Sequence, residues 1–501
     1  MSLLTKNKAL RRCFAIIAGA IVPLAFAPFN LYFFSFISLS ALFYLWYETE
    51  TSSETFILGY LFGLAMFGVG VNWLHISINL FGGMNIIGAY FFTFLLIAFI
   101  SLYPALCGYF ANRFLKDFYF IALPTLWLIT EWCRGWVLTG FPWLNIGTSQ
   151  TDSFFSHFAP ILGDYGISFI VCVVAISITF LIRGNSKQRI IYSAVIILIL
   201  MSSFLLKNIN WTEKKGEELS VTLVQGAIPQ KLKWISEYRE KTYQIYSNLS
   251  GPYWSSDLII WPETAIPSYY HLADDFISRI TEKQQEFDTL FMSGIVNKDQ
   301  TNNKYFNSIL LMDSEHRFYN KHHLVPFGEY LPFKSLLDRL LRFLQIPMSD
   351  FSSGDFNNKL LETDKAIFGM SICYEDAYGT EVRQSLPDAN ILINVSNDAW
   401  FGDSLAPHQH LQIARMRAIE NGRYMIRSTN NGISAVIDNK GNVVALSPQF
   451  EPHALHTKAE LFIGETPYSK YGNNLIISIS FFILLLSFFF QRKIDNRFKN
   501  Q

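Results

Sequence analysis

A series of apolar segments, each near the length needed to cross a lipid bilayer, dominates the first 207 residues and returns once near the C-terminus. A helix needs about 20 consecutive apolar residues to span the hydrocarbon core. The sequence therefore predicts a polytopic α-helical membrane domain of about eight spans. The segments that meet or approach this length are residues 10–28, 31–47, 56–74, 86–111, 118–138, 164–182, 190–206 and 474–490.

The charges of the loops predict how these spans are oriented. Lys and Arg are enriched in cytoplasmic loops, and the short loops 75–85 and 139–163 contain neither. We therefore expect the N- and C-termini to be cytoplasmic and the basic N-terminal segment to be a retained anchor rather than a cleaved signal peptide. The basic residues that fall on the inner side are Arg113, Lys116, Arg183, Lys187, Arg189, Arg492, Lys493, Arg497 and Lys499.

The chain between the seventh and eighth spans has a different pattern. Short apolar runs typical of strands alternate with helical stretches, and several of the runs are continuously apolar, which favours a sheet covered on both faces. We predict seven membrane helices in 1–207, an external α/β domain in 208–473, and a last membrane helix with a basic tail in 474–501. The predicted strands are 220–224, 257–261, 290–294, 308–312, 366–372, 389–395 and 434–437, and the predicted helices are 236–249, 272–286 and 407–422.

Composition agrees with a membrane protein that carries a soluble part. Half of the residues are hydrophobic and only 16% are charged, against roughly 25% in soluble domains. The formal net charge is zero, so no overall field favours nucleic acid. Four of the five cysteines fall in or beside apolar segments, and Cys373 alone lies in the polar region. This scattered set indicates neither a disulfide framework nor a metal site.

Three polar residues follow apolar runs of the external domain. Glu263 comes after Leu258-Ile-Ile-Trp-Pro262, Lys321 comes shortly after 308–312, and Cys373 comes after Phe368-Gly-Met-Ser-Ile372. Because the ends of adjacent strands converge at one edge of a sheet, these side chains are predicted to meet. A thiol attacks only as thiolate and needs a base. A carboxylate can accept its proton, and an ammonium can stabilise the thiolate and an oxyanion.

These residues resemble the nitrilase (carbon–nitrogen hydrolase) superfamily, whose Glu, Lys and Cys occur in this order. The match is closer to the apolipoprotein N-acyltransferase family and covers essentially the whole chain. The blocks that carry the resemblance are Trp261-Pro-Glu-Thr-Ala-Ile-Pro267, Asn320-Lys-His-His-Leu-Val-Pro-Phe-Gly-Glu-Tyr-Leu-Pro332, Ile372-Cys-Tyr-Glu-Asp376, Val395-Ser-Asn-Asp-Ala-Trp-Phe-Gly-Asp403, Pro407-His-Gln-His410 and Arg415-Met-Arg-Ala-Ile-Glu420.

The resemblance implies a fold and a reaction. It implies a nitrilase-like αββα sandwich in the periplasm, next to the inner membrane. It further implies that Cys373 takes an acyl chain from a phospholipid as a thioester and passes it to the α-amine of a diacylglyceryl-modified N-terminal cysteine of a lipoprotein. Glu263 would be the base and Lys321 the oxyanion and thiolate partner, without cofactor or metal. We expect a monomer. The residues expected to support the site are Trp234, Glu329, Tyr374 and Glu375.

Several other polar residues allow two interpretations. Arg134 and Glu131, near the end of a span, could contact a phospholipid headgroup, and the alternative is an ordinary interfacial anchor. His322, His323, His408 and His410 lack carboxylates at ligand spacing, so hydrogen bonding is favoured over metal binding. Asn397-Asp398 is typical of a turn or helix cap. The apolar stretch 336–346 could be a lid at the membrane or an ordinary core helix.

Two other functions compete with acyl transfer. A membrane-tethered amidase would use the same three residues on a small amide, but a soluble substrate does not require about eight spans. A transporter or receptor with a degenerate domain predicts that one of the three residues is lost, and all three are present.

Overall fold

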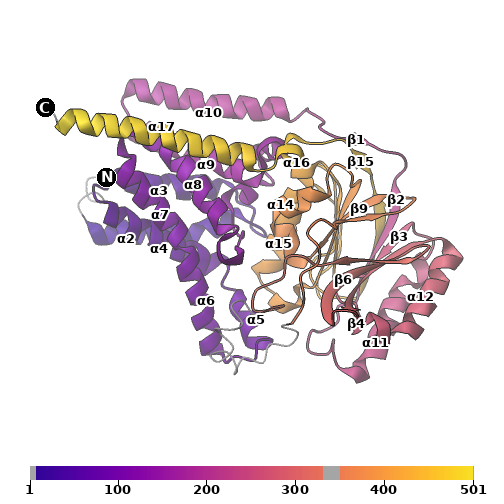
Figure 1. Cartoon of the computed structure of the whole chain (residues 1–501). Helices are drawn as coiled ribbons and strands as arrows, with labels where there is room; N and C mark the ends of the chain where they lie inside the picture. The colour runs from indigo at the N-terminus through magenta and orange to yellow at the C-terminus, as the bar shows by residue number, and fades with distance from the viewer. Residues whose placement is uncertain (1–6, 331–349, 500–501) are drawn as a thin grey trace. The chain divides into compact units, whose positions relative to one another are not determined.

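The computed structural model describes residues 7–330 and 350–499 (Figure 1). The stretch 336–346, interpreted above as a lid or core helix, lies outside these residues. Contacts within the described chain divide it into two compact units. The helical unit comprises residues up to 75, 87–209 and from 471 onward, and the sandwich unit comprises 76–86 and 210–470. The predicted limits at 207 and 473 lie within a few residues of these, whereas the short segment 76–86 was not predicted to join the sandwich unit.

The helical unit places a helix within each of the eight predicted apolar segments. Among the described residues, five helical stretches are long and apolar enough to cross a membrane, namely 52–70, 86–114, 154–183, 186–206 and 474–497. The predicted number of eight spans therefore stays a prediction, because α2, α3 and α8 have only 14, 15 and 16 residues. The helices are α2 Lys8–Ile21, α3 Phe33–Tyr47, α4 Ser52–Gly70, α6 Ile86–Ile100, α7 Leu102–Phe114, α8 Tyr119–Arg134, α9 Ala159–Arg183, α10 Ser186–Leu206 and α17 Asn474–Lys499.

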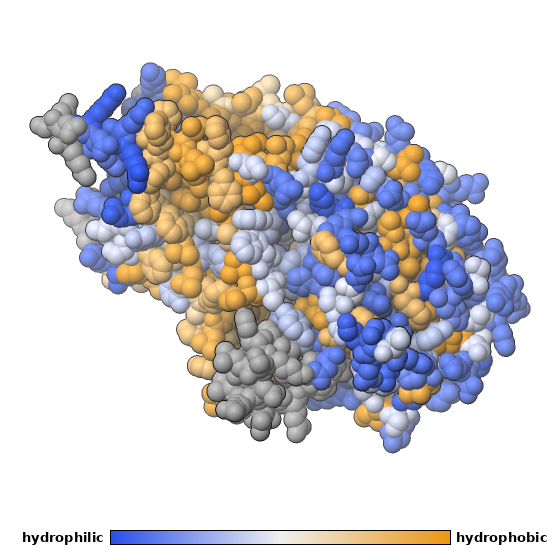
Figure 2. Space-filling view, viewed as in Figure 1, coloured by the Kyte–Doolittle hydropathy of each residue, from blue (hydrophilic) through white to orange (hydrophobic). Residues whose placement is uncertain are grey.

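The outer faces of this unit are strongly apolar. Leu198 on α10 and Leu485 on α17 are 65% and 68% exposed, and Figure 2 shows apolar residues gathered over the helical part of the chain. Soluble monomers rarely expose apolar patches of this extent. These faces fit contact with lipid, in agreement with the predicted membrane domain.

The sandwich unit contains two facing sheets with helices on their outer sides (Figure 1). One sheet has the strand order β13-β12-β11-β10-β9-β8, and the other β14-β2-β3-β5-β6-β7, with β4 paired to β5. The strands are β2 Leu219–Gln225, β3 Leu258–Ile260, β4 Ile266–Tyr269, β5 Leu290–Asp299, β6 Lys304–Met312, β7 His316–Asn320, β8 Leu360–Glu362, β9 Ile367–Ile372, β10 Ile391–Ser396, β11 Met425–Thr429, β12 Ala435–Ile437, β13 Val443–Leu446 and β14 His453–Ala459. A separate pair joins β1 Glu213–Lys214 to β15 Phe462–Ile463.

The core explains why the central strands are continuously apolar. Leu258 and Ile260 of β3 lie in the core between the two sheets, whereas Ile259 packs under α11 Ser236–Ser250 and α12 Asp274–Phe287. Likewise, Ile391 and Ile393 of β10 face the inner core, and Leu392 packs under α15 Leu405–Asn421. Both faces of each strand are covered, so alternation with polar residues is absent. The predicted αββα sandwich is confirmed.

The ends of the parallel strands position the candidate site. Strands β2, β3 and β5 are parallel, as are β9, β10 and β11. Their carboxyl ends therefore lie along one edge of each sheet. Glu263 follows β3, and Cys373 follows β9.

Candidate active site

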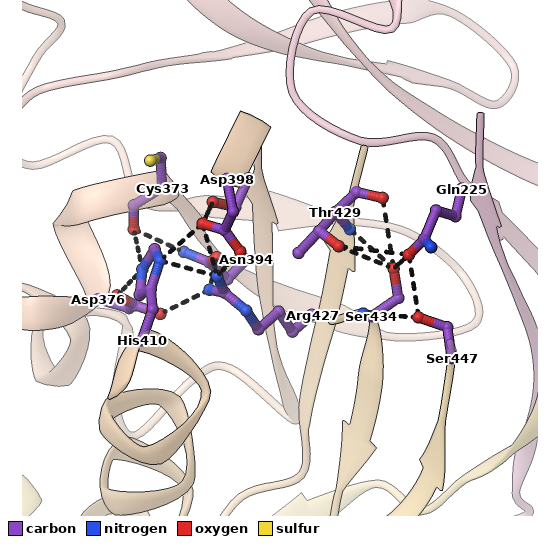
Figure 3. A network of polar contacts seen from close by, with 11 residues as sticks. Gln225, Cys373, Asp376, Asn394, Asp398, His410, Arg427, Thr429, Ser434 and Ser447 are labelled. Carbon is purple, nitrogen blue, oxygen red and sulfur yellow. Dashed lines mark hydrogen bonds and ion pairs between the residues drawn. The ribbon is translucent and has the colours of Figure 1, made fainter. Parts of the chain in front are cut away.

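Cys373 lies at a sharp turn where β9 ends. Its φ of 52° is in the left-handed region, which non-glycine residues seldom adopt, and a short 3₁₀ helix, Cys373–Ala377, begins at this residue. The carbonyl oxygen of Cys373 accepts hydrogen bonds from Asn394 Nδ2 at 3.1 Å and from His410 Nε2 at 3.3 Å. In Figure 3 this carbonyl faces the polar network, and the sulfur points away from it. The strained turn thus presents the thiol to the opposite side.

Glu263 is a buried carboxylate with one oxygen lacking a partner. Its side chain is 7% exposed, and Oε1 accepts a hydrogen bond from Asn307 Nδ2 at 2.7 Å. Within the described chain, the buried Oε2 accepts no hydrogen bond. Burial raises the pKa of this carboxyl above its usual value, and Glu329 raises it further, against the opposing effect of Lys321. These are the properties of a group able to take up a proton.

Lys321 follows β7 and is only 1% exposed. Its Nζ lies 2.9 Å and 2.8 Å from the two oxygens of Glu329 and 4.0 Å from Glu263 Oε1. Burial by itself lowers the pKa of this ammonium, but the Glu329 and Glu263 carboxylates outweigh it, so the net shift is upward. Lys321 is therefore a permanent cation in the site.

The Cys373 thiol belongs to the same electrostatic cluster. Burial raises its pKa above the ordinary value, the Glu263 carboxylate adds to the increase, and Lys321 opposes it. The folded resting state therefore favours the neutral thiol, and thiolate forms only when a base removes the proton. The structure brings together the three residues that the sequence predicted to meet.

The residues predicted to support the site occupy different positions. Glu329 binds Lys321 and also accepts from Asn307 Nδ2 at 2.9 Å and from Val325 N at 2.8 Å. Tyr374 is half-buried, and its ring packs edge-on against Tyr378. Trp234 is exposed. The side chain that reaches Glu263 is that of its neighbour Lys233, whose Nζ donates to the Glu263 carbonyl oxygen at 2.9 Å.

Glu375 is fully occupied by structural hydrogen bonds. One oxygen accepts from the backbone N–H groups of His322 and His323, and the other accepts from the Tyr319 hydroxyl and the Ile372 N–H. These bonds tie the segment that follows Lys321 to the turn at Cys373. Glu375 thus joins the segments that carry Lys321 and Cys373 and has no oxygen left for proton transfer.

A buried ionic network lies beneath Cys373 (Figure 3). Arg427 of β11 contacts Asp376 at 3.3 Å and Asp398 at 3.0 Å. His410 of α15 contacts the same two carboxylates at 2.8 Å and 3.1 Å. Burial and Arg427 lower the pKa of His410, but the two carboxylates outweigh them, so the net shift is upward. Arg427 and Asn394 were not predicted: the segment 425–429, Met-Ile-Arg-Ser-Thr, is mostly polar and gave no sign of a buried strand.

The structure refines the interpretation of Asn397-Asp398 as a turn or helix cap. Asn397 precedes a 3₁₀ helix but makes no side-chain capping bond; its amide instead donates to Gln230 at 2.7 Å. Asp398 is part of the buried network rather than a cap. His322 and His323 also bind protein groups. His322 contacts the Gly354 carbonyl, and His323 contacts Glu381.

Arg134 is buried within the helical unit. It is 3% exposed, and its guanidinium donates to the Phe141 carbonyl at 2.8 Å and to Asn145 Oδ1 at 2.7 Å. Glu131 lies 3.7 Å away and accepts from the Ile146 N–H. An interfacial anchor would be exposed, and a headgroup ligand would have a free donor at the surface. The contacts favour a supporting role, in which Arg134 holds the 141–146 loop.

Comparison with known proteins places these observations in a family. The N-terminal domain of apolipoprotein N-acyltransferases matches residues 18–177, and the carbon–nitrogen hydrolase domain matches residues 220–458. The apolipoprotein N-acyltransferase of Methylococcus capsulatus is 38% identical over 466 residues, which cover 92% of each chain. That of Pasteurella multocida is 38% identical over 499 residues, covering 96% of this chain and 95% of its own.

Two solved structures are similar to about half of the chain. A carbon–nitrogen hydrolase from Helicobacter pylori is 16% identical with a TM-score of 0.36, and covers 52% of this chain and 92% of its own. An amidase from Nesterenkonia is 16% identical with a TM-score of 0.35, covering 49% and 92%. The relatives from Methylococcus capsulatus and Pasteurella multocida match nearly the full length of the chain. The chain belongs to the apolipoprotein N-acyltransferase family.

Proposed function

We propose that this chain is an N-acyltransferase that moves an acyl chain from a phospholipid, through a thioester on Cys373, to the α-amine of a diacylglyceryl-modified lipoprotein cysteine. One observation carries the chemical part of the proposal: the buried Glu263 keeps one oxygen without a donor, in the same charge cluster as Lys321 and Cys373. Membership of the family favours this reaction over hydrolysis of a small amide.

In the first half-reaction Glu263 accepts the proton from Cys373 Sγ, and the thiolate attacks the ester carbonyl of the phospholipid. Negative charge develops on the carbonyl oxygen, where Lys321 and the backbone N–H of Tyr374 are suited to stabilise it. The tetrahedral intermediate collapses to the thioester. The departing lysophospholipid oxygen takes the proton held by Glu263, so the carboxylate is restored.

In the second half-reaction the lipoprotein amine attacks the thioester carbonyl. Glu263 removes one proton from the attacking nitrogen, and the thiolate leaves as the amide forms. Glu263 then returns the proton to Cys373. The upward shift of the Glu263 pKa suits both directions of transfer, because a carboxyl with an ordinary pKa would hold a proton too weakly near neutral pH.

The supporting residues act through these groups. Glu329 and Asn307 hold Lys321 and Glu263 in place, and Glu375 fixes the turn that carries Cys373 and Tyr374. Trp234, exposed beside Lys233, is suited to contact an apolar substrate chain.

Both substrates are anchored in a bilayer, which gives the helical unit a role in bringing them to the site. We place the chain in the inner membrane with 208–473 in the periplasm, both termini in the cytoplasm, and the enzyme working as a monomer. The loop charges support this orientation, and the apolar surfaces of the helices support the membrane location.

A labelling experiment tests the proposal. Detergent-purified protein is incubated with a phospholipid carrying a labelled acyl chain, and the label is mapped by peptide mass spectrometry. We expect label on Cys373 that neutral hydroxylamine removes and that a diacylated lipopeptide with a free N-terminus discharges as an amide. Absence of label together with hydrolysis of a small amide would instead support the amidase.

A further inference from the structure

We propose that Lys233 is a positioning residue for the acyl transfer: its ammonium holds the main chain at Glu263 and adds positive charge to the buried cluster that contains Glu263 and Cys373. This inference rests on the proposed function. Lys321, the cation expected to stabilise the thiolate, is already paired with Glu329.

Lys321 is largely neutralised by Glu329. Both Glu329 oxygens lie within 2.9 Å of its Nζ, whereas Glu263 Oε1 is 4.0 Å away. A paired ammonium can still donate to an oxyanion, but the charge it offers to a nearby thiolate is reduced by its carboxylate partner. When Cys373 is a thiolate, the site would therefore hold two negative charges, those of Cys373 and Glu329. Lys321 alone would offset one of them.

Lys233 is a second buried cation with no such partner. It is 2% exposed, and its ammonium donates a hydrogen bond to the Glu263 carbonyl oxygen at 2.9 Å. In the part of the chain that the structure describes, no carboxylate oxygen lies within ion-pair distance of its Nζ. An ammonium has three donors, so two remain for groups within the site. Burial of an unpaired ammonium is costly unless nearby negative charge offsets it.

The groups that face Lys233 are those of the reaction. The charges that act on it are those of Glu263 and Cys373, and Lys321 and Glu329 act in turn on Glu263. Burial lowers the pKa of Lys233 to about 8, with Glu263 and Cys373 opposing the decrease. The side chain therefore remains mostly protonated at neutral pH, and its charge is available when Glu263 draws the proton from the thiol.

The charge balance of the cluster depends on this residue. Glu263 and Glu329 carry two negative charges, and Lys321 and Lys233 carry two positive charges. Transfer of a proton from Cys373 to Glu263 leaves the total unchanged at zero. Without Lys233 the cluster would carry a net negative charge, which opposes formation of a thiolate in a buried site.

The pH dependence of Cys373 alkylation tests the charge directly, without any substrate. Full-length protein in detergent is treated with iodoacetamide over a pH series, and the Cys373 peptide is quantified by mass spectrometry. We expect Lys233→Met to move the midpoint of alkylation upward by about one pH unit, so that the rate at neutral pH falls about tenfold. Lys231→Met, two residues away at an exposed position, should keep the wild-type midpoint.

A second variant separates charge from anchoring of the main chain. Lys233→Gln keeps a donor for the Glu263 carbonyl and loses the charge, so it should shift the midpoint as Lys233→Met does while retaining the wild-type thermal unfolding temperature. A wild-type midpoint in folded Lys233→Gln or Lys233→Met would overturn the proposal. Phospholipid labelling of the wild-type enzyme is read separately, because its absence would refute the acyltransferase function and leave the alkylation result intact.

Discussion

At the scale of single residues, Glu263 and Glu375 show how burial can serve opposite purposes. Both carboxylates are buried in the same unit. Glu375 accepts four hydrogen bonds from the two segments it joins, whereas among the described residues the Glu263 carboxylate accepts one, from Asn307. A carboxylate with its acceptors filled stabilises the fold. A buried carboxylate with one oxygen that accepts no hydrogen bond destabilises the fold and retains the capacity to bind a proton.

This difference predicts the behaviour of Glu263→Gln. The pKa of Glu263 is raised in the folded state, so the folded protein holds this proton more tightly and its stability falls as pH rises above the ordinary value of 4.5. A neutral glutamine removes that loss. We expect acyl-enzyme formation to be abolished and the thermal unfolding temperature at neutral pH to equal or exceed that of the wild type, with the difference vanishing below pH of about 4.

Glu375→Gln is the matched control for this measurement. It leaves backbone donors around one oxygen without a charged acceptor, so the free energy of unfolding should fall by about 1–3 kcal/mol. A Glu263→Gln protein that unfolds at a much lower temperature than the wild type would contradict the assignment of Glu263 as a strained, functional carboxylate.

At the scale of secondary structure elements, the close approach of β5 to the chain after β3 positions Glu263, the proposed base. Gly294 lies on β5, and a Cβ at this position would come within 2.6 Å of the Glu263 Cα and of the Pro262 oxygen. These are backbone atoms, which cannot turn aside as a flexible side chain would. The glycine therefore sets how far Glu263 extends toward Cys373.

We predict that Gly294→Ala lowers acyl-enzyme formation by about 100-fold, because a displacement near 1 Å is enough to misalign a catalytic group. Single-turnover labelling from phospholipid measures the effect. Gly251→Ala is the control, since a Cβ there would meet nothing within 4 Å. Wild-type labelling by a folded Gly294→Ala protein would show that the base tolerates this shift.

The ionic network joins three further elements: the turn at Cys373, the helix α15 and the strand β11. Arg427→Met removes the arginine and leaves Asp376 and Asp398 buried with a single histidine between them. We expect a loss of about 3–5 kcal/mol in the free energy of unfolding, measured by chemical denaturation in detergent. Arg279→Met, at an exposed ion pair with Glu240, should leave the denaturation midpoint unchanged.

At the scale of the whole molecule, the loop charges predict which parts of the chain face each side of the membrane. In a variant with its five cysteines replaced, a cysteine introduced at Thr301 should react with a membrane-impermeant maleimide in spheroplasts. A cysteine introduced at Lys187 should react only after permeabilisation. Both positions are exposed, so accessibility within the protein is matched. Labelling of position 187 in intact spheroplasts would reverse the proposed orientation.

Strands made of continuous apolar runs were predictable, whereas the edge strand β14 and the buried but polar strand β11 were not. The runs at 290–294 and 308–312 are apolar because helices and the second sheet cover them, and each falls within a longer strand. In contrast, β14 lies at the edge of its sheet and contains His453, His456 and Lys458. His456 and Lys458 are exposed, so the pattern of this strand did not distinguish it from a loop.

The sequence by itself determined the apolar segments, the α/β character of the polar region and the three residues Glu263, Lys321 and Cys373, because local hydrophobicity and short motifs carry that information. Only the tertiary structure decided which groups surround them. Lys233, Asn307 and Arg427 come from segments far from Cys373 in the chain, and their importance depends on burial and on which charges they meet. Burial and charge pairing arise when the two sheets pack, so no single segment of the sequence contains them.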